Sequence, residues 1–565
     1  MSEKISYELL SERIGPLPIV NYFIEQIEIP ELLEQHVPVT DKRCRLPYAK
    51  GIGLLIRSIL VEREPIYRHY EVIGSFTSSL FGLTEEEGKK LCDDQLGRSL
   101  DHLFFCDRGT LLTEMVVSAA KRFNVRMDEL HNDSTSIRFT GQYRSKTSRS
   151  LRGKRIPWIT YGFSKDHRPD LKQLLFILTT SADGGVPVQF RCENGNTNDS
   201  ATHIQTWETL RKAAGSPDFL YVGDSKLCSY ETVKHIDRSG GRLVTVMPRS
   251  RKEDGLFRKW IQNNTPEWEK VWDRPNPRKK YGPRDRWYVY KWHVPSMEGW
   301  PVIWVYSKLL ALHQKKRRLE RITKAAEELL DLDKRLQRPR PRLKSRKDVG
   351  ERVEEVLKRL NVTRYFKVEI WQESMHKYKQ ERKGRPGPNT RYRRETKRRL
   401  RVRHYMIQEM IDYDENSDGM YPLLTNDRTL TPRQVLEAHK RQPDVEKRFE
   451  QVKTVYEIAP VFLKNEGRIE AFFFVYFMVL LIQGLIERQI RNAMKEENID
   501  ALPIYPEDRS CRRPTAQQVL RLFSFTEKHV LKINGKVEKV FPPEFTPIQK
   551  QVLKLLGVPM SAFQI

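Results

Sequence analysis

The first part of the chain is patterned as helices. Apolar residues recur at steps of three or four along residues 15–36 and 50–73, and prolines stand where the pattern breaks. Residues of both charges fill the positions between them. We therefore expect residues 1–125 to form a separate helical N-terminal domain.

From about residue 126 the pattern changes to that of strands. Short apolar runs bounded by turn residues predict a first strand that ends near Asp133 and four later strands, with a helix between the third and the fourth. Three strands in hairpin order, a crossover helix and further strands predict an α/β sheet of the ribonuclease H type. The later elements are expected as strands 174–181 and 186–193, helix 206–215, and strands 219–224 and 241–248.

Residues 251–417 depart from this pattern and predict an inserted domain. Residues 286–307 are rich in aromatic and β-branched residues around a turn, which is typical of β-hairpins. Apolar residues at seven-residue steps within 312–336, followed by an amphipathic segment at 349–360, predict a helical hairpin. Residues 418–427 then read as a strand that returns to the sheet, so the core comprises 126–250 and 418–500.

Two helices and a small domain are expected in the last part of the chain. A stripe of Val445, Phe449, Val452 and Tyr456 predicts one continuous helix through residues 437–453. The longest apolar run, residues 471–482, has 12 residues, whereas a membrane span needs about 20. We expect a buried helix packed on the core there and no transmembrane segment. Residues 501–565 predict a small C-terminal domain, with a hairpin at Asn534-Gly535 and a helix that begins at Pro547.

The charge of the chain indicates a polyanionic partner. The 565 residues include 101 Lys and Arg against 74 Asp and Glu, which gives a net charge of +27. Residues 377–403 alone hold 13 Lys and Arg against two Glu. We predict a DNA-clamping loop or arm there, with Arg391, Arg393 and Arg394 at its centre, because contacts with phosphates release counterions. A solvated charge run or an address signal is the alternative.

The six cysteines are scattered without a CxxC pair. This spacing argues against a zinc site and favours reduced thiols, mostly in the core. Since no secretory leader precedes them, we expect a cytosolic protein.

Glu446 lies off the apolar stripe of its helix, and Lys453 follows two turns later on the same helix face. A carboxylate and an ammonium placed in this way can hold a metal ion and a phosphate side by side, although a solvated ion pair has the same spacing. Two aspartates upstream strengthen the first interpretation. Asp133 lies on a predicted strand and Asp224 at the tip of another, which would be its neighbour in the sheet.

Together these three segments resemble the DDE transposases of bacterial and archaeal insertion sequences. The resemblance is to the insertion-sequence-four-like superfamily with a large β insertion, whose third motif is Tyr, two residues, Arg, three residues, Glu, six residues, Lys. Glu446 and Lys453 match the Glu and the Lys, whereas His439 stands at the Tyr position and Gln442 at the Arg position. Residues 91–104, 162–173 and 460–477 also resemble this family.

The resemblance implies a two-metal site that cleaves DNA. Asp133 would bridge two Mg²⁺ ions, for which Mn²⁺ can substitute, while Asp224 and Glu446 would each hold one ion; such ions prefer oxygen ligands. Lys453 would grip a terminal phosphate. Further DNA contacts are expected from His439, Lys440 and Arg441. Because 222 residues separate Asp224 from Glu446, an inserted domain must lie between them.

The implied function is that of a DNA transposase in a prokaryotic cell, cytoplasmic and associated with the nucleoid. Such an enzyme hydrolyses DNA at the terminal inverted repeats, transfers the freed 3′-hydroxyl to target DNA, and acts as at least a homodimer. No nucleotide is expected, since no GxxxxGK[ST] motif is present. An aromatic ring of the insertion can stack on an extruded base; the candidates, most of which must be core residues, are Trp287, Trp292, Trp300 and Trp304.

The N-terminal domain of this family helps to recognise the terminal repeats. Arg57, Arg63, Arg68 and His69 are candidates to face DNA, and an ordinary solvated helix face is the alternative.

Two other functions are compatible with the sequence. One is a DNA-binding repressor that keeps the fold without catalysis, and the other is a metal-dependent nuclease without strand transfer. The intact Asp133, Asp224 and Glu446 argue against the repressor, and the aromatic insertion and the basic arm argue against the nuclease.

Overall fold

The computed structural model describes residues 6–564 except 40, 42, 43, 63, 90, 146, 167, 277, 278, 280 and 460–462. The chain forms two compact units. The first comprises Met1–Val246, Thr425–Asp427 and Glu437–Ile565, and the second comprises Met247–Leu424 and Arg428–Leu436.

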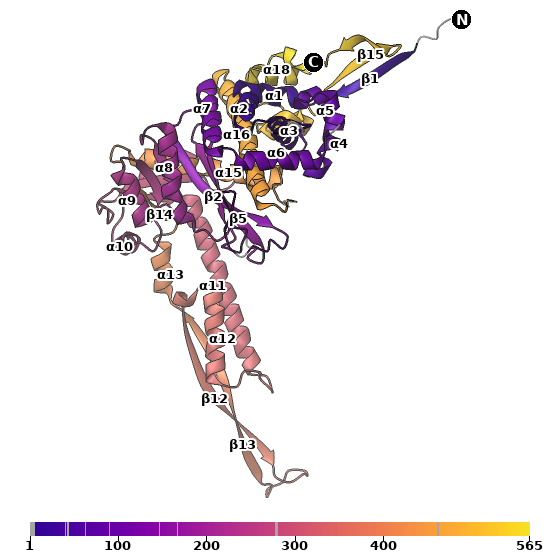
Figure 1. Ribbon diagram of the computed structural model, residues 1–565. Coiled ribbons are helices and arrows are strands. Elements are labelled where there is room, and N and C mark those ends of the chain that lie inside the picture. The colour runs from indigo at the N-terminus through magenta and orange to yellow at the C-terminus, as the bar shows by residue number, and fades with distance from the viewer. Residues whose placement is uncertain are drawn as a thin grey trace. The chain divides into compact units, whose positions relative to one another are not determined.

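The first unit contains a five-stranded stretch of mixed sheet in the order β6-β5-β2-β7-β8. Figure 1 labels β2 and β5 of this sheet. The pairs β6·β5 and β5·β2 are antiparallel, and the pairs β2·β7 and β7·β8 are parallel. Helices α8 (His203–Ala214) and α9 (Tyr230–Arg238) supply the crossovers. This strand order confirms the predicted ribonuclease H type. The strands are β2 (Glu129–Phe139), β5 (Lys172–Ser181), β6 (Pro187–Asn194), β7 (Leu220–Gly223) and β8 (Arg242–Val246).

The N-terminal region is helical, as predicted. Its strand β1 (Tyr7–Arg13) was not expected and pairs antiparallel with β15 (Glu527–Ile533), which pairs in turn with β16 (Lys536–Phe541). The two ends of the chain therefore share one sheet, whereas the sequence predicted separate terminal domains. The main helices of this region are α1 (Leu17–Gln26), α2 (Ile29–His36), α3 (Tyr48–Val61), α6 (Asp93–Phe105) and α7 (Arg108–Phe123).

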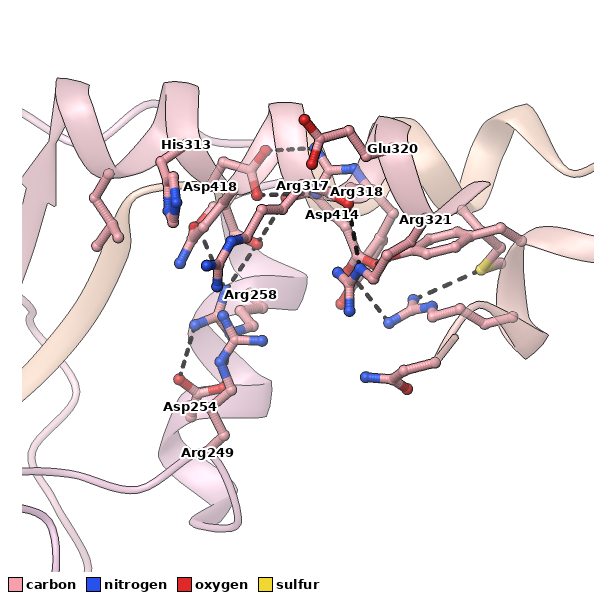
Figure 2. Close-up of a pocket in the computed structure, with 18 of the residues that line it drawn as sticks. Arg249, Asp254, Arg258, His313, Arg317, Arg318, Glu320, Arg321, Asp414 and Asp418 are labelled. Atoms are coloured by element: carbon pink, nitrogen blue, oxygen red, sulfur yellow. Dashed lines mark hydrogen bonds and ion pairs between the residues drawn. The ribbon is translucent and has the colours of Figure 1, made fainter. Parts of the chain in front are cut away.

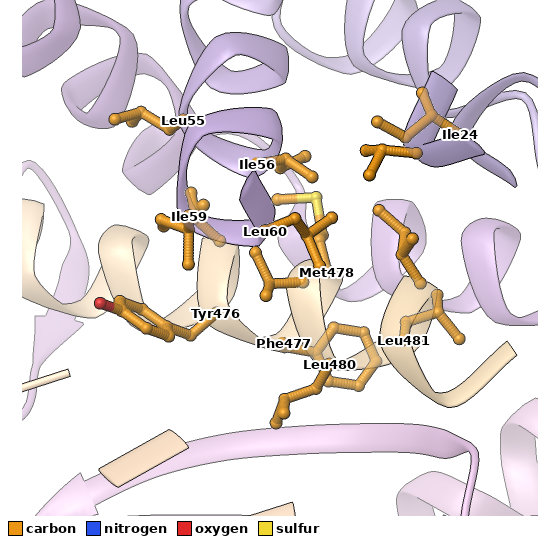
Figure 3. Close-up of a cluster of buried hydrophobic side chains, with 14 of the residues drawn as sticks. Ile24, Leu55, Ile56, Ile59, Leu60, Tyr476, Phe477, Met478, Leu480 and Leu481 are labelled. Carbon is orange, nitrogen blue, oxygen red and sulfur yellow. The ribbon is translucent and has the colours of Figure 1, made fainter. Parts of the chain in front are cut away.

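Helix α16 (Glu466–Glu496) is the core helix of the first unit. It is apolar on every side, and such a helix is stable only when it is surrounded by protein or lipid. Its length and composition would suffice to cross a membrane, but 94% of its most apolar window lies buried inside the protein. Figure 3 shows Tyr476, Met478 and Leu481 packed among side chains of α1 and α3 such as Ile24 and Ile59. The prediction of a buried helix is confirmed.

A buried ion pair joins α16 to α15 (Pro443–Glu450). Arg448 of α15 donates to Glu487 of α16 at 2.9 Å, and the two side chains are 3% and 2% exposed. Arg448 also donates to the carbonyl oxygens of Gly184 and Gly185, in the turn between β5 and β6, at 3.1 and 2.8 Å. One guanidinium therefore fastens α15 to the core helix and to the sheet.

The second unit contains the strand order β14-β11-β10-β9, in which every pair is antiparallel. The hairpin expected within residues 286–307 is formed by β10 (Asp285–Lys291) and β11 (Val302–Ser307). The flanking strands are β9 (Glu269–Arg274) and β14 (Met420–Thr425), and two short helices are α10 (Lys252–Trp260) and α13 (Gln408–Glu415).

The predicted helical hairpin and basic arm are both present in the second unit. Helices α11 (Lys308–Leu336) and α12 (Arg346–Arg359) form the helical hairpin, while β12 (Phe366–Gln380) and β13 (Tyr392–Met406) form a long two-stranded ribbon beside it (Figure 1). The apolar set that packs inside includes Ile322, Leu329 and Leu336. Leu312 and Leu319, which are also seven residues apart, lie outside this packed set and are 45% and 64% exposed.

The ion pair between Arg448 and Glu487 predicts a large effect of a small substitution. In Glu487→Gln the buried guanidinium of Arg448 loses its counter-charge, so we expect the free energy of unfolding to fall by about 3–5 kcal/mol. Denaturant unfolding of the full chain measures this change. Glu496→Gln, at the exposed end of the same helix, is the matched control and should alter stability by less than about 0.5 kcal/mol. Equal stability of the two variants would contradict the prediction.

Candidate active site

Asp133 occupies the middle of β2, and the strand continues to Phe139 beyond the predicted end. Its carboxylate accepts the backbone N–H of Ser134 at 2.7 Å. Burial raises the pKa of Asp133 to about 6; the Lys165 ammonium opposes this shift, and the carboxylates of Asp224 and Glu446 add to it. Asp224 and Glu446 are therefore close enough to Asp133 to act on its carboxylate electrostatically.

The sheet register brings Asp224 beside Asp133. Strands β2 and β7 are parallel, with Leu130 opposite Tyr221 and His131 opposite Val222. Two residues further along each strand, this register places Asp133 and Asp224 at the same level. The carboxylate of Asp224 accepts the backbone N–H of Lys226 at 2.9 Å.

Glu446 reaches the same region from α15, which packs on β2 and β5. The helix predicted through residues 437–453 is in fact divided. Helix α14 (Pro432–Arg441) ends before Gln442, α15 starts at Pro443, and a π-helical turn (Gln451–Val455) follows. Pro443 has no backbone N–H, so the hydrogen-bond ladder is interrupted there. The side-chain oxygen of Gln442, at the break, accepts a hydrogen bond from Nδ1 of His131, and its amide nitrogen donates to the carbonyl oxygen of Asn132.

Lys453 lies within the π-helical turn and is not free. Its ammonium pairs with Asp166 at 2.8 Å, and Asp166 also pairs with Arg138 at 3.3 Å. The prediction that Lys453 shares a helix face with Glu446 assumed a regular α-helix. The hydrogen bonds of the π-helical turn span five residues and not four, so the α-helical spacing of side chains does not continue to Lys453.

Lys165, next to Asp166, is a site residue that the sequence did not single out. Its ammonium donates to the carbonyl and hydroxyl oxygens of Ser134 at 2.6 and 2.8 Å, and it pairs with Asp199 at 3.0 Å and with Asp133 at 3.7 Å. The only sequence signal was its place in the family-like stretch 162–173, which carries no periodicity to suggest a role.

The basic residues expected to contact DNA around His439 are engaged with the protein. Burial lowers the pKa of His439 to about 3, and the charges of Lys440 and His131 add to this effect. Arg441 donates two hydrogen bonds of 2.6 Å to the carboxylate of Glu129. In this conformation His439 is neutral and Arg441 holds α14 against β2, so neither is available as a free cation.

The carboxylate set suits a divalent cation by its chemistry. Mg²⁺ takes hard oxygen ligands, and Asp133, Asp224 and Glu446 supply carboxylates whose mutual repulsion a cation would relieve. Within the described ranges, however, no three or more His, Cys, Asp or Glu side chains are gathered tightly enough to hold a metal ion. The exposed Glu446 is the side chain with the most freedom to complete such a set.

The tryptophans expected to stack on a base are core residues of the second unit. Trp304 stacks on Phe257 at 3.6 Å between ring centroids, and Trp287 meets Trp272 edge to face. Trp287 and Trp304 lie on opposite faces of the sheet, and each is covered by other aromatic side chains. None of the four tryptophans presents the open face that stacking needs. The exposed fractions of Trp287, Trp292, Trp300 and Trp304 are 9%, 5%, 5% and 0%.

The arm residues are exposed, unlike most of the N-terminal candidates. Arg391 precedes β13, Arg393 and Arg394 lie on it, and all three are exposed. In the N-terminal region, Arg57 and His69 are only 8% and 1% exposed, which contradicts the expectation that they face DNA. Arg68 is exposed and pairs with Glu71 at 2.6 Å, and Arg63 lies outside the described residues.

A ribonuclease H type sheet with acidic residues on adjacent strands and a facing helix defines a class of proteins that process phosphodiesters. The sequence model for the transposase DDE domain matches residues 127–482, and this chain belongs to that family. Residues 9–117 match a domain of unknown function, DUF4277.

One similar solved structure is a "piggyBac transposase synaptic complex with hairpin DNA", at 10% sequence identity and a TM-score of 0.36 over 92% of this chain and 83% of that chain. No curated protein matches this sequence.

The contact between Arg441 and Glu129 predicts a pH-dependent contribution to stability. Burial raises the pKa of the Glu129 carboxyl, but its hydrogen bonds with His131 and Arg441 lower this pKa by more. The pKa is therefore about 2, against an ordinary value of 4.5. A carboxyl group whose pKa is lowered in the folded protein stabilises the fold at pH values above its ordinary pKa. This stabilisation is lost as the pH falls through the lowered pKa. Glu129→Gln should therefore cost up to about 3 kcal/mol near neutral pH, and progressively less as the pH falls from 4.5 toward 2. Urea unfolding measures both proteins across this range; a cost independent of pH would contradict the prediction.

Proposed function

We propose that this protein is the transposase of an insertion sequence of the insertion-sequence-four-like type, acting on DNA in the cytoplasm of a prokaryotic cell. It hydrolyses a phosphodiester bond at each terminal inverted repeat and then joins the freed 3′-hydroxyl to target DNA. The observation that carries this proposal is the parallel pairing of β2 with β7, which sets Asp133 and Asp224 side by side while α15, the helix of Glu446, packs on β2, in a chain of the DDE transposase family.

Asp133, Asp224 and Glu446 would hold the divalent cations, with Asp133 shared between two Mg²⁺ ions, or Mn²⁺ ions in their place. When bound, these ions stabilise the charges that develop on the attacking and leaving oxygens and promote ionisation of a bound water. The chain contributes the rigid part of the site, since β2 and β7 fix the two aspartates at one level. It contributes Glu446 through α15, which Arg448 fastens to the core.

Lys165 contributes positive charge beside Asp133, and Lys453 pairs with Asp166, the residue next to Lys165. In the protein alone, Asp166 neutralises Lys453, and Asp199 together with Asp133 neutralises Lys165. A terminal phosphate entering the site would replace Asp166 as the partner of Lys453, because a phosphate accepts charge-assisted hydrogen bonds in the same way as a carboxylate.

The arm formed by β12 and β13 is proposed to hold DNA outside the active site. Arg391, Arg393 and Arg394 are exposed on this ribbon, and each phosphate that they contact would release counterions. Each chain supplies one set of carboxylates and an insertion sequence has two ends, so we expect a homodimer on double-stranded DNA.

Cleavage of DNA by a Glu446→Gln variant tests the proposed function. The amide removes one anionic metal ligand and with it several kcal/mol of charge stabilisation, so cleavage should fall by about 10³-fold or more while DNA binding persists. The substrate is a labelled duplex that carries the element's terminal repeat, incubated with Mg²⁺. Glu450→Gln, exposed one turn further along α15, is the matched control and should cleave like the native protein.

The products of the same assay separate this function from its two alternatives. Cleavage at the repeat boundary together with joined products supports a transposase. Tight, salt-sensitive binding with no cleavage by either protein would favour a repressor. Cleavage that yields no joined product would favour a nuclease without strand transfer.

The ion pair between Asp166 and Lys453 predicts that a charge removal strengthens DNA binding. Asp166→Asn frees Lys453 from a partly exposed ion pair worth about 0.2–1 kcal/mol, so the Kd for the terminal-repeat duplex should fall up to about fivefold at low salt. Fluorescence anisotropy measures this change. In a Lys453→Ala background the same substitution should have a smaller effect, which a double-mutant cycle quantifies. An equal effect in both backgrounds would show that Asp166 does not act through Lys453.

A further inference from the structure

The second unit contains an open cleft of about 1210 Å³ that lies between α10, α11 and α13. Its walls come from the loop before α10, one face of α11, the segment after α12, and α13 with the residues that follow it. Every lining residue belongs to the second unit, so this cleft is separate from the carboxylates of the first unit.

Three of the arginines that line the cleft are already neutralised. Arg258 pairs with Asp254 at 2.7 Å, Arg364 pairs with Asp414 at 3.2 Å, and Arg318 pairs with Asp418. The first pair lies within α10, and the other two join separate segments of the walls. Because each of these positive charges has a counter-charge in place, the three pairs have a structural role.

The other three arginines of the cleft are not held in ion pairs in the described part of the chain, and the carboxylates of Asp254, Asp414 and Asp418 attract Arg249 only from beyond ion-pair distance. Arg249, Arg317 and Arg321 line the cleft and take part in no ion pair among the described residues. Arg249 and Arg317 are exposed, and Arg321 is partly exposed and donates to the carbonyl oxygen of Arg317 at 3.3 Å. Figure 2 shows their side chains gathered around the cleft, with Arg249 and Arg258 on the side opposite His313 and Arg317 of α11. An anion would satisfy these guanidinium groups, which suit phosphate in particular.

The positive residues on α11 form a row. His313, Arg317 and Arg321 recur every four residues, so they lie above one another on one helix face. Eight residues of helix extend over about 12 Å, which is too long for one phosphate ion and suited to successive phosphates of a polymer.

We infer that this cleft binds the sugar-phosphate backbone of double-stranded DNA at a site additional to the active site and to the arm. The inference rests on the proposed function, since it takes DNA to be the partner of this protein. Arg317 and Arg321 contact successive phosphates, and Arg249 contacts the backbone from the opposite wall. These arginine contacts give no preference for a base sequence, because they are made with phosphates and not with base edges.

Equilibrium binding of full-length protein to a labelled duplex at several salt concentrations tests the inference. Removing two phosphate contacts in Arg317→Ala/Arg321→Ala should reduce the slope of log K against log salt by about 1.8 and weaken binding by on the order of tenfold at 0.1 M salt. Arg317→Lys/Arg321→Lys keeps the charges and should retain most of the slope. The matched control is Lys347→Ala/Lys358→Ala, which removes two exposed charges from α12 outside the cleft.

A second measurement distinguishes DNA from a free anion and reports whether the variant folds. A photo-crosslinking residue at position 313 should crosslink to the labelled duplex, and circular dichroism should show equal melting of variant and native protein. A native salt slope in the double alanine variant would overturn the inference. So would inorganic phosphate that stabilises the native protein but not the variant while DNA binding is equal in both.

The same titrations separate this inference from the proposed function. If the native protein binds no duplex at low salt, the proposed function fails and the inference fails with it. If Glu446→Gln binds DNA normally and has lost cleavage while the cleft variant binds like the native protein, the function stands and the inference alone is overturned.

Discussion

The position of Glu446 depends on a buried ion pair two residues further along its helix. Arg448 reaches Glu487 of the core helix α16 and two carbonyl oxygens of the turn between β5 and β6. An unpaired charge in this place would cost several kcal/mol, so α15 cannot separate from the core without losing stability. The turn takes part through Gly184 and Gly185, whose φ angles of +83° and +66° are accessible to glycine at little cost. The helix that carries the Glu446 side chain is thus fixed by contacts that are not themselves part of the chemistry.

The sheet could be predicted from the sequence because the signals that define each strand lie within a few neighbouring residues. Apolar runs, turn residues and the chain order of strands and helices define β5, β6, β7 and β8 to within a few residues, and the order of a ribonuclease H sheet follows from them. Asp133 and Asp224 were found in this way together with the family pattern. The pairing of β1 with β15 was not found, because its partners lie more than 500 residues apart and β1 is a largely exposed strand.

Long-range ion pairs engage two of the basic residues that the sequence assigned to DNA, Arg441 and Lys453. A basic residue in a sequence looks the same whether it faces DNA or a carboxylate of its own chain. Arg441 lies in a basic run, yet Glu129, 312 positions away, binds it through both oxygens. Lys165 and Asp166 belong to a loop without periodicity, and their importance appears only once the fold brings them to Asp133 and Lys453. Pro443 was visible in the sequence, but the apolar stripe through the same residues favoured one continuous helix.

The division between paired and unpaired cations suggests an order of events for the proposed function. In the catalytic unit Lys453 and Lys165 are held by carboxylates, so they present little free charge to DNA. In the second unit the arm and the cleft carry exposed arginines, and Arg317 and Arg321 have no ion-pair partner among the residues that the structure describes. Long-range attraction acts on unpaired charge, so initial DNA capture falls to the second unit. Under the proposed function, Lys453 and Lys165 would exchange a carboxylate for a phosphate only when a scissile end is in place, and their internal pairing would then act against indiscriminate cleavage.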